Sequence, residues 1–74
     1  MRRLFVIGDL PAWTTAPDLE AAVRHRLEAR EDVRGAYRVF VTRGRLNVTN
    51  IPDEAAADVR DWFSRSEKAG RLLR

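Results

Sequence analysis

The 74-residue sequence contains no cysteine and only one histidine, His25. Without cysteine the chain has no disulfide framework and no thiolate metal site, and the compartment in which it works is left open. A lone histidine does not make a metal centre. We therefore interpret His25, which falls outside the apolar stripe of its predicted helix, as a surface residue.

Groups typical of catalysis are also missing. The four glycines, Gly8, Gly35, Gly44 and Gly70, are isolated from one another, so the chain has no Gly-rich phosphate loop. It has no Cys/His or Ser/His/Asp set either. Asp9, at the end of the first predicted strand, is the one acid in a site-like place. We expect a protein that is not an enzyme and that holds no cofactor and no metal.

No long hydrophobic run is present. The apolar run Leu4–Ile7 is far too short for a secretory signal, and no segment approaches the ~20 residues that span a bilayer. We expect a cytoplasmic chain without a membrane partner, folded as a single domain over residues 1–74. A core of this size stabilises by only about 3–5 kcal/mol, so a partner or a second copy would add stability.

Lysine is almost absent, so nearly all of the positive charge comes from arginine. Of 14 basic residues only Lys68 is lysine, and the formal net charge is +3. The planar fork of arginine suits carboxylates and phosphates, but a charge of +3 is too small to indicate nucleic acid by itself. The position of the arginines is more informative, because residues 34–51 contain four arginines and no acid.

Within that region, Tyr37–Ile51 predicts a β-hairpin. Arg43-Gly44 separates two runs rich in β-branched and aromatic residues, and Gly44 accepts the positive φ of a two-residue turn. The register then pairs Thr42 with Arg45 and continues to Arg38 with Thr49. It sorts the side chains onto two faces. The core face carries Tyr37, Val39, Val41, Leu46 and Val48. The outer face carries Arg38, Phe40, Thr42, Arg45, Asn47 and Thr49.

Helices are predicted on either side of the hairpin. The first begins at Thr15, a capping residue followed by Pro17 and Asp18, and runs to about Glu31. Its apolar stripe consists of Leu19, Ala22, Val23 and Leu27. Along this helix Glu20 and Arg24 form an outer pair, while Arg26 and Arg30 extend from the edge of the stripe.

The second helix starts near Pro52, with Asp53 and Glu54 in its first turn. It buries Ala55, Val59, Trp62 and Phe63. Residues 66–74 have two readings. Leu73 continues the helical stripe, whereas Gly70 is suited to end the helix and leave residues 71–74 as a last edge strand.

With a first strand at Arg2–Ile7, the order is strand, helix, strand, strand, helix and, in one reading, a final strand. This order predicts an α+β two-layer sandwich of the ferredoxin-like type. A right-handed crossover puts both helices on one face of the antiparallel sheet. The other face then shows the outer side of the hairpin beside either Phe5 and Ile7 or Leu4 and Val6, because the apolar run does not fix the phase.

With these elements in this order, the chain resembles an RNA-recognition motif. LFVIGDLP is similar to the first-strand signature of that family, TTAPDLEAAV to its first helix and RGRLNVTN to its third-strand signature. Arg45 and Asn47 stand where the family has stacking aromatics. The resemblance implies a βαββαβ ferredoxin-like fold and binding of single-stranded RNA on the open sheet face.

Two functions follow from the outer face, which in its simplest interpretation is only solvated. The candidate binding residues are Phe5, Arg38, Phe40, Arg43, Arg45 and Asn47. We favour a small protein-binding adaptor, regulator or inhibitor that meets an acidic partner or a second copy of itself, because this demands least of the residues present. The alternative is binding of single-stranded RNA or DNA through the basic hairpin 37–51.

Overall fold

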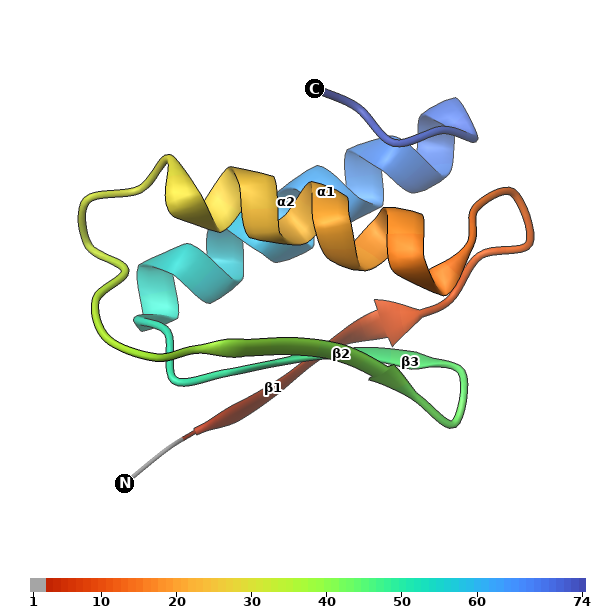
Figure 1. Ribbon diagram of the computed structural model, residues 1–74. Coiled ribbons are helices and arrows are strands. Elements are labelled where there is room, and N and C mark those ends of the chain that lie inside the picture. The colour runs from red at the N-terminus through yellow and green to blue at the C-terminus, as the bar shows by residue number, and fades with distance from the viewer. Residues whose placement is uncertain (1–2) are drawn as a thin grey trace.

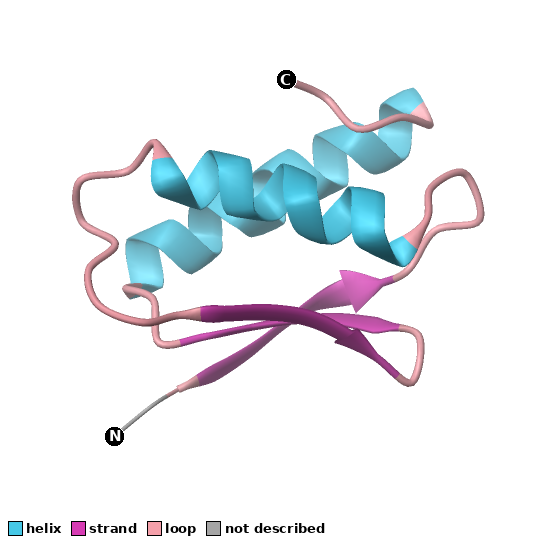
Figure 2. Cartoon of the chain, in the orientation of Figure 1, coloured by secondary structure: helices cyan, strands magenta, loops and turns pink. Residues whose placement is uncertain are grey.

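The computed structural model describes residues 3–74 and shows a sheet covered on one face by two helices (Figure 1). The elements are β1 (Leu4–Asp9), α1 (Ala16–Glu28), β2 (Arg38–Thr42), β3 (Arg45–Thr49) and α2 (Asp53–Ala69). Figure 2 shows the strands together on one side of the helices. The three strands are antiparallel and lie in the order β1-β3-β2. The predicted α+β class, with an antiparallel sheet and two helices on one side, is therefore confirmed.

The hairpin has the predicted register. Thr42 pairs with Arg45, and the ladder continues to Arg38 with Thr49. Arg43 and Gly44 have φ angles of 51° and 73°, as a two-residue turn with two left-handed residues requires. Because side chains alternate along a strand, this register directs Val39, Leu46 and Val48 under the helices, where they are buried.

An irregularity in β1 sets which of its side chains face the helices. Phe5 pairs with Val48 and Val6 with Asn47, but Gly8 pairs with Leu46, so Ile7 is an extra residue in a β-bulge. Gly8 then lies below α2, where a Cβ would come within 2.5 Å of the Phe63 ring. Only glycine at this position lets α2 approach β1 without displacing that ring.

Helix α1 begins where it was predicted to begin and ends earlier. The Thr15 hydroxyl accepts a hydrogen bond from the Asp18 N–H at 3.3 Å, which confirms Thr15 as the cap. The last helical residue is Glu28 rather than Glu31. The predicted stripe packs on the sheet, with Leu19, Val23 and Leu27 fully buried.

Helix α2 ends at Ala69, and the chain then turns back along it. Gly70 has a φ of 68°, which supplies the left-handed residue that ends the helix. The Trp62 indole N–H donates to the carbonyl of Leu73 at 2.8 Å, and the Leu73 N–H donates to the Ser66 hydroxyl. Residues 71–74 therefore lie against α2. Gly70 ends the helix as one reading predicted, but the last edge strand of that reading is wrong, and so is the other reading, in which the helix continues to Leu73. Within residues 3–74, β1 has β3 as its one strand neighbour.

Two further expectations concern the first residue of the first strand and the absence of a membrane-spanning segment. The predicted first residue of β1, Arg2, lies outside the described residues. In the described part of the chain, neither helix combines the length and the apolar composition needed to cross a bilayer.

Candidate functional site

The sheet surface opposite the helices, here called the open face, brings together most of the predicted site residues. Its central row runs across the sheet from Val6 through Asn47 to Phe40. Leu4 and Val6 are exposed by 58% and 42% of their area, which is unusual for large apolar side chains on a small domain. The open face consists of Leu4, Val6, Asp9, Arg38, Phe40, Thr42, Arg45, Asn47 and Thr49.

Phe5 is not part of this surface. It pairs with Val48, so its ring lies on the helix side of the sheet and is only 6% exposed. The guanidinium groups of Arg3 and Arg60 lie 5.0 Å and 5.7 Å from its centroid. The expectation that Phe5 contributes to binding on the open face is therefore wrong. Leu4 and Val6 lie on the open face instead, which is the second of the two arrangements predicted for this strand.

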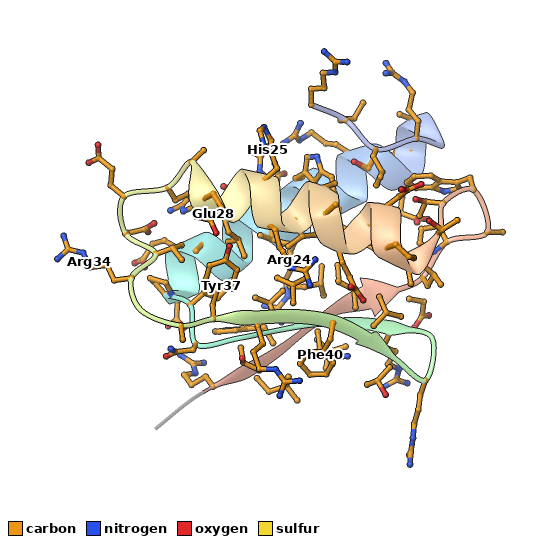
Figure 3. The ribbon with its side chains drawn as sticks, in the orientation of Figure 1. Arg24, His25, Glu28, Arg34, Tyr37 and Phe40 are labelled. Atoms are coloured by element: carbon orange, nitrogen blue, oxygen red, sulfur yellow. The ribbon has the colours of Figure 1, made fainter. Side chains whose placement is uncertain are left out.

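Asn47 and Phe40 form the middle of the open face, but Asn47 offers little surface to a ligand. The residue is 5% exposed, and its amide N–H donates to the Arg45 carbonyl at 2.9 Å. Phe40 points away from the helices (Figure 3), and the Arg38 guanidinium lies 5.0 Å from the centre of its ring. Such a cation–π contact holds the arginine beside the ring and keeps its charge at the surface.

Three arginines give the open face its charge. Arg45 lies 3.7 Å from Asp9, with both side chains largely exposed, so this ion pair contributes little. Arg38 and Arg43 form no ion pair with any residue of the described chain 3–74. Arg43 and Arg45 border a shallow hollow that is also lined by Val6, Thr42 and Asn47. The surface thus carries apolar side chains on its two edge strands, polar side chains on the central strand, and arginines toward the ends of the strands.

Helix α1 covers the outer edge of β2 with a pair that the sequence indicated only as an outer-face ion pair. Glu20 and Arg24 lie 3.6 Å apart. The Glu20 carboxylate accepts a hydrogen bond from the Val41 N–H at 3.0 Å, and Arg24 donates to the Val39 carbonyl at 3.1 Å. These side chains satisfy two main-chain groups that an edge strand would otherwise expose.

A second cluster joins the two helices. Asp58 on α2 accepts hydrogen bonds from Arg26 of α1 at 2.7 Å and from Arg30, just after the end of α1, at 2.8 Å. Burial alone would raise the pKa of Asp58, but the hydrogen bonds from the two arginines outweigh it and hold that pKa below its usual value. Arg30 also binds Asp32, which raises the pKa of Arg30 and lowers that of Asp32.

This cluster borders a groove of about 750 Å³ between the helices, and the groove is the larger concavity of the two described here. The arginines at its rim already share the carboxylate of Asp58. The chain's own Leu72 and Leu73 form part of its wall. The charges of Arg26, Arg30 and Asp58 are satisfied within the chain, in contrast to those of Arg38 and Arg43 at the open face.

His25 also borders this groove and is exposed, as expected. Among residues 3–74 there is no group of three or more His, Cys, Asp or Glu side chains placed to hold a metal ion. Comparisons of the chain with family models, curated proteins and solved structures found no match.

Proposed function

We propose that this chain is a small, non-catalytic, cytoplasmic protein-binding domain, acting as an adaptor, regulator or inhibitor, whose open face binds an acidic surface of a partner protein. One observation carries the proposal. Exposed Leu4 and Val6 share the open face with the half-buried ring of Phe40 and with Arg38, and neither Arg38 nor Arg43 has an ion pair within residues 3–74.

Physical principles favour a protein partner for such a surface. Aromatic and arginine side chains contribute most to binding at the centres of protein interfaces. Basic groups at the margin speed the encounter with an acidic partner and disfavour basic ones. Binding would also cover Leu4 and Val6, which otherwise stay in water at a cost of about 25 cal/mol per Å² of apolar area.

We further propose that the domain is a ferredoxin-like one without its final strand, related in layout to the RNA-recognition motif. The strand order β1-β3-β2 and the position of both helices on one face support this proposal (Figure 1). In a ferredoxin-like sheet the last strand lies beside β1, and among residues 3–74 no strand occupies that place.

Nucleic-acid binding is the second candidate, and the three arginines Arg38, Arg43 and Arg45 favour it. Single-stranded nucleic acid is held by positive charge together with aromatic rings on which bases stack. In the described chain, Phe40 is the one aromatic side chain on the open face, because Phe5 lies on the other side. A single ring, already in contact with Arg38, gives a base little to stack on.

Selection of random displayed peptides on the purified protein tests the proposed function. We expect the selected peptides to be rich in Asp, Glu and aliphatic residues. Their affinity should fall about tenfold, equivalent to about 1.4 kcal/mol, in Phe40→Ala and in Arg45→Ala. It should be unchanged in Arg65→Ala, which removes an exposed arginine of α2. Selected peptides without acids, or equal binding by all four proteins, would contradict the proposal.

Fluorescence anisotropy with labelled single-stranded RNA, single-stranded DNA and duplex DNA separates the two candidates. We expect no binding at physiological salt. Micromolar affinity that weakens with salt and is lost in Phe40→Ala and Arg45→Ala would establish the nucleic-acid function instead.

A further inference from the structure

Within residues 3–74, no strand lies beside the main-chain groups at the outer edge of β1. In an antiparallel pair, successive residues direct their N–H and C=O groups alternately toward the neighbouring strand and away from it. The Asn50 N–H donates to the Arg3 carbonyl at 3.1 Å, so Arg3 and Phe5 face β3. Leu4 and Val6 therefore direct their N–H and C=O groups to the free edge.

Within residues 3–74, this edge has fewer side-chain hydrogen bonds than the edge of β2. On β2, Glu20 and Arg24 bind one outward N–H and one outward C=O. On β1 one side chain reaches the edge, since Arg60 donates to the Val6 carbonyl at 3.3 Å. No side chain of residues 3–74 binds the N–H of Leu4 or Val6. Both residues also place exposed apolar side chains on the open face.

We propose that the partner protein adds an extended antiparallel strand to the edge of β1, and that apolar and acidic residues alternate along that strand. This inference rests on the proposed function and specifies how the partner binds. Main-chain hydrogen bonds would supply affinity, and the two rows of side chains would supply selectivity, as in other cases of strand addition.

The alternation follows from the different chemistry on the two sides of β1. On the open face, the added strand lies beside Leu4 and Val6, which favours apolar side chains. On the helix side it lies beside Arg3 and Arg60, whose guanidinium groups cover Phe5. Arg3 is bound to Asp53, but Arg60 has no acidic partner in residues 3–74. A glutamate on the added strand would draw Arg60 from the Val6 carbonyl and pair with it.

Charge favours an acidic partner over a second copy of this chain. Two copies paired antiparallel through β1 would bring Arg60 and Arg3 of each protomer near the same residues of the other. Like charges across a newly desolvated edge oppose association. An acidic strand gains attraction from the same arginines.

A synthetic peptide of alternating glutamate and valine, blocked at both ends, is the probe for this inference. Titration into the isotope-labelled protein should shift the amide resonances of Leu4 and Val6 and slow their exchange with solvent. A peptide with lysine in place of every glutamate should bind at least tenfold more weakly, as should the glutamate peptide to Arg60→Ala; Arg65→Ala is the matched control.

N-methylation of the peptide distinguishes strand pairing from side-chain binding. In the proposed pairing the valines face the same side as Leu4 and Val6, so their N–H groups point at β1 and the glutamate N–H groups point to solvent. Methylating the valine nitrogens should abolish binding, whereas methylating the glutamate nitrogens should leave it within about twofold.

Equal affinity of the two methylated peptides, or no binding of the unmodified peptide, would overturn the strand-addition inference. Neither result affects the proposed function, which depends on the response of display-selected peptides to Phe40→Ala and Arg45→Ala. Sedimentation velocity without peptide tests whether a second copy of the chain binds this edge. A dimer that dissociates on Val6→Lys would show that it does and would overturn the inference.

Discussion

The sheet has two edges, and they differ in how many hydrogen bonds the neighbouring helix makes to the main chain of the edge strand. Helix α1 places Glu20 and Arg24 against the main chain of β2, where each makes a hydrogen bond. Among residues 3–74, helix α2 offers β1 one side-chain hydrogen bond, the longer contact from Arg60. Both helices carry charged side chains of suitable length, so this fold is able to cover an edge. The weaker cover at β1 is therefore a feature of that edge and not a limit of the fold.

The largest effect on stability is expected from Gly8→Val, which disturbs the packing of α2 on β1. A side chain at Gly8 collides with the Phe63 ring of α2. We expect a loss of about 2–3 kcal/mol in the free energy of unfolding, measured by urea denaturation. Thr42→Val, at an exposed position of β2, is the control and should change stability by less than about 0.5 kcal/mol. Equal effects of the two substitutions would show that α2 does not pack closely on β1.

Next in size is Asp58→Asn, because Asp58 joins the helix that covers β2 to the helix that lies near β1. The substitution leaves Arg26 and Arg30 without their shared carboxylate. We expect a cost of about 1–2 kcal/mol at neutral pH, less than for a fully buried pair because the site is partly exposed.

The effect of Asp58→Asn should depend on pH in one direction. The pKa of Asp58 is lower in the folded protein than in the unfolded chain, where it is about 3.9. Its contribution is therefore fully present above the unfolded pKa and is lost as the pH falls through the folded pKa. Stability curves of the two proteins should converge in acid. Curves that stay parallel down to the acid transition would contradict this account.

A smaller effect is expected when the cover of β2 is removed by Glu20→Ala with Arg24→Ala. The loss of two main-chain contacts should cost about 1 kcal/mol. It should also give β2 an unprotected edge, so that sedimentation velocity detects more self-association than in the wild type. Asp61→Ala with Arg65→Ala removes an ion pair of the same spacing that touches no strand. Self-association in both double variants, or in neither, would argue against the capping role.

The smallest effect concerns Tyr37, which precedes β2 and donates a hydrogen bond to Glu28 of α1 (Figure 3). Burial and this bond raise the pKa of Tyr37 to about 12. Its contribution to stability is thus present below the unfolded pKa of about 10 and is lost as the pH rises through the folded pKa. Absorbance titration of this single tyrosine should show the raised pKa, and Tyr37→Phe should cost less than about 1 kcal/mol.

The hairpin was predictable because its pattern has a period of two and its turn has two residues. A slip of one residue would have put Arg38 or Arg45 under the helices. This is why Arg38, Phe40, Arg43 and Arg45 were placed on or beside the open face from the sequence. The same reasoning placed Asn47 there correctly, but only the structure shows that its amide binds the main chain.

The phase of β1 was not predictable, because four consecutive apolar residues carry no alternation and the bulge at Ile7 changes the period. Phe5 was misplaced for this reason. The partner of Arg26 and Arg30 was not predictable either. Their positions near the apolar stripe indicate partial burial, but they do not indicate which carboxylate on α2 binds them. Residues 71–74 were ambiguous because Leu73 and Gly70 pointed to different structures.

The bulge at Ile7 also has a consequence for polymerisation. A long, flat edge strand can stack on identical strands without limit, which is how fibrils grow. On β1 the regular stretch before the bulge is short, and the extra residue twists the strand away from a straight neighbour. We infer that β1 has room for one short partner strand while offering a poor template for fibres, so that its unprotected edge is compatible with high concentrations of the free protein.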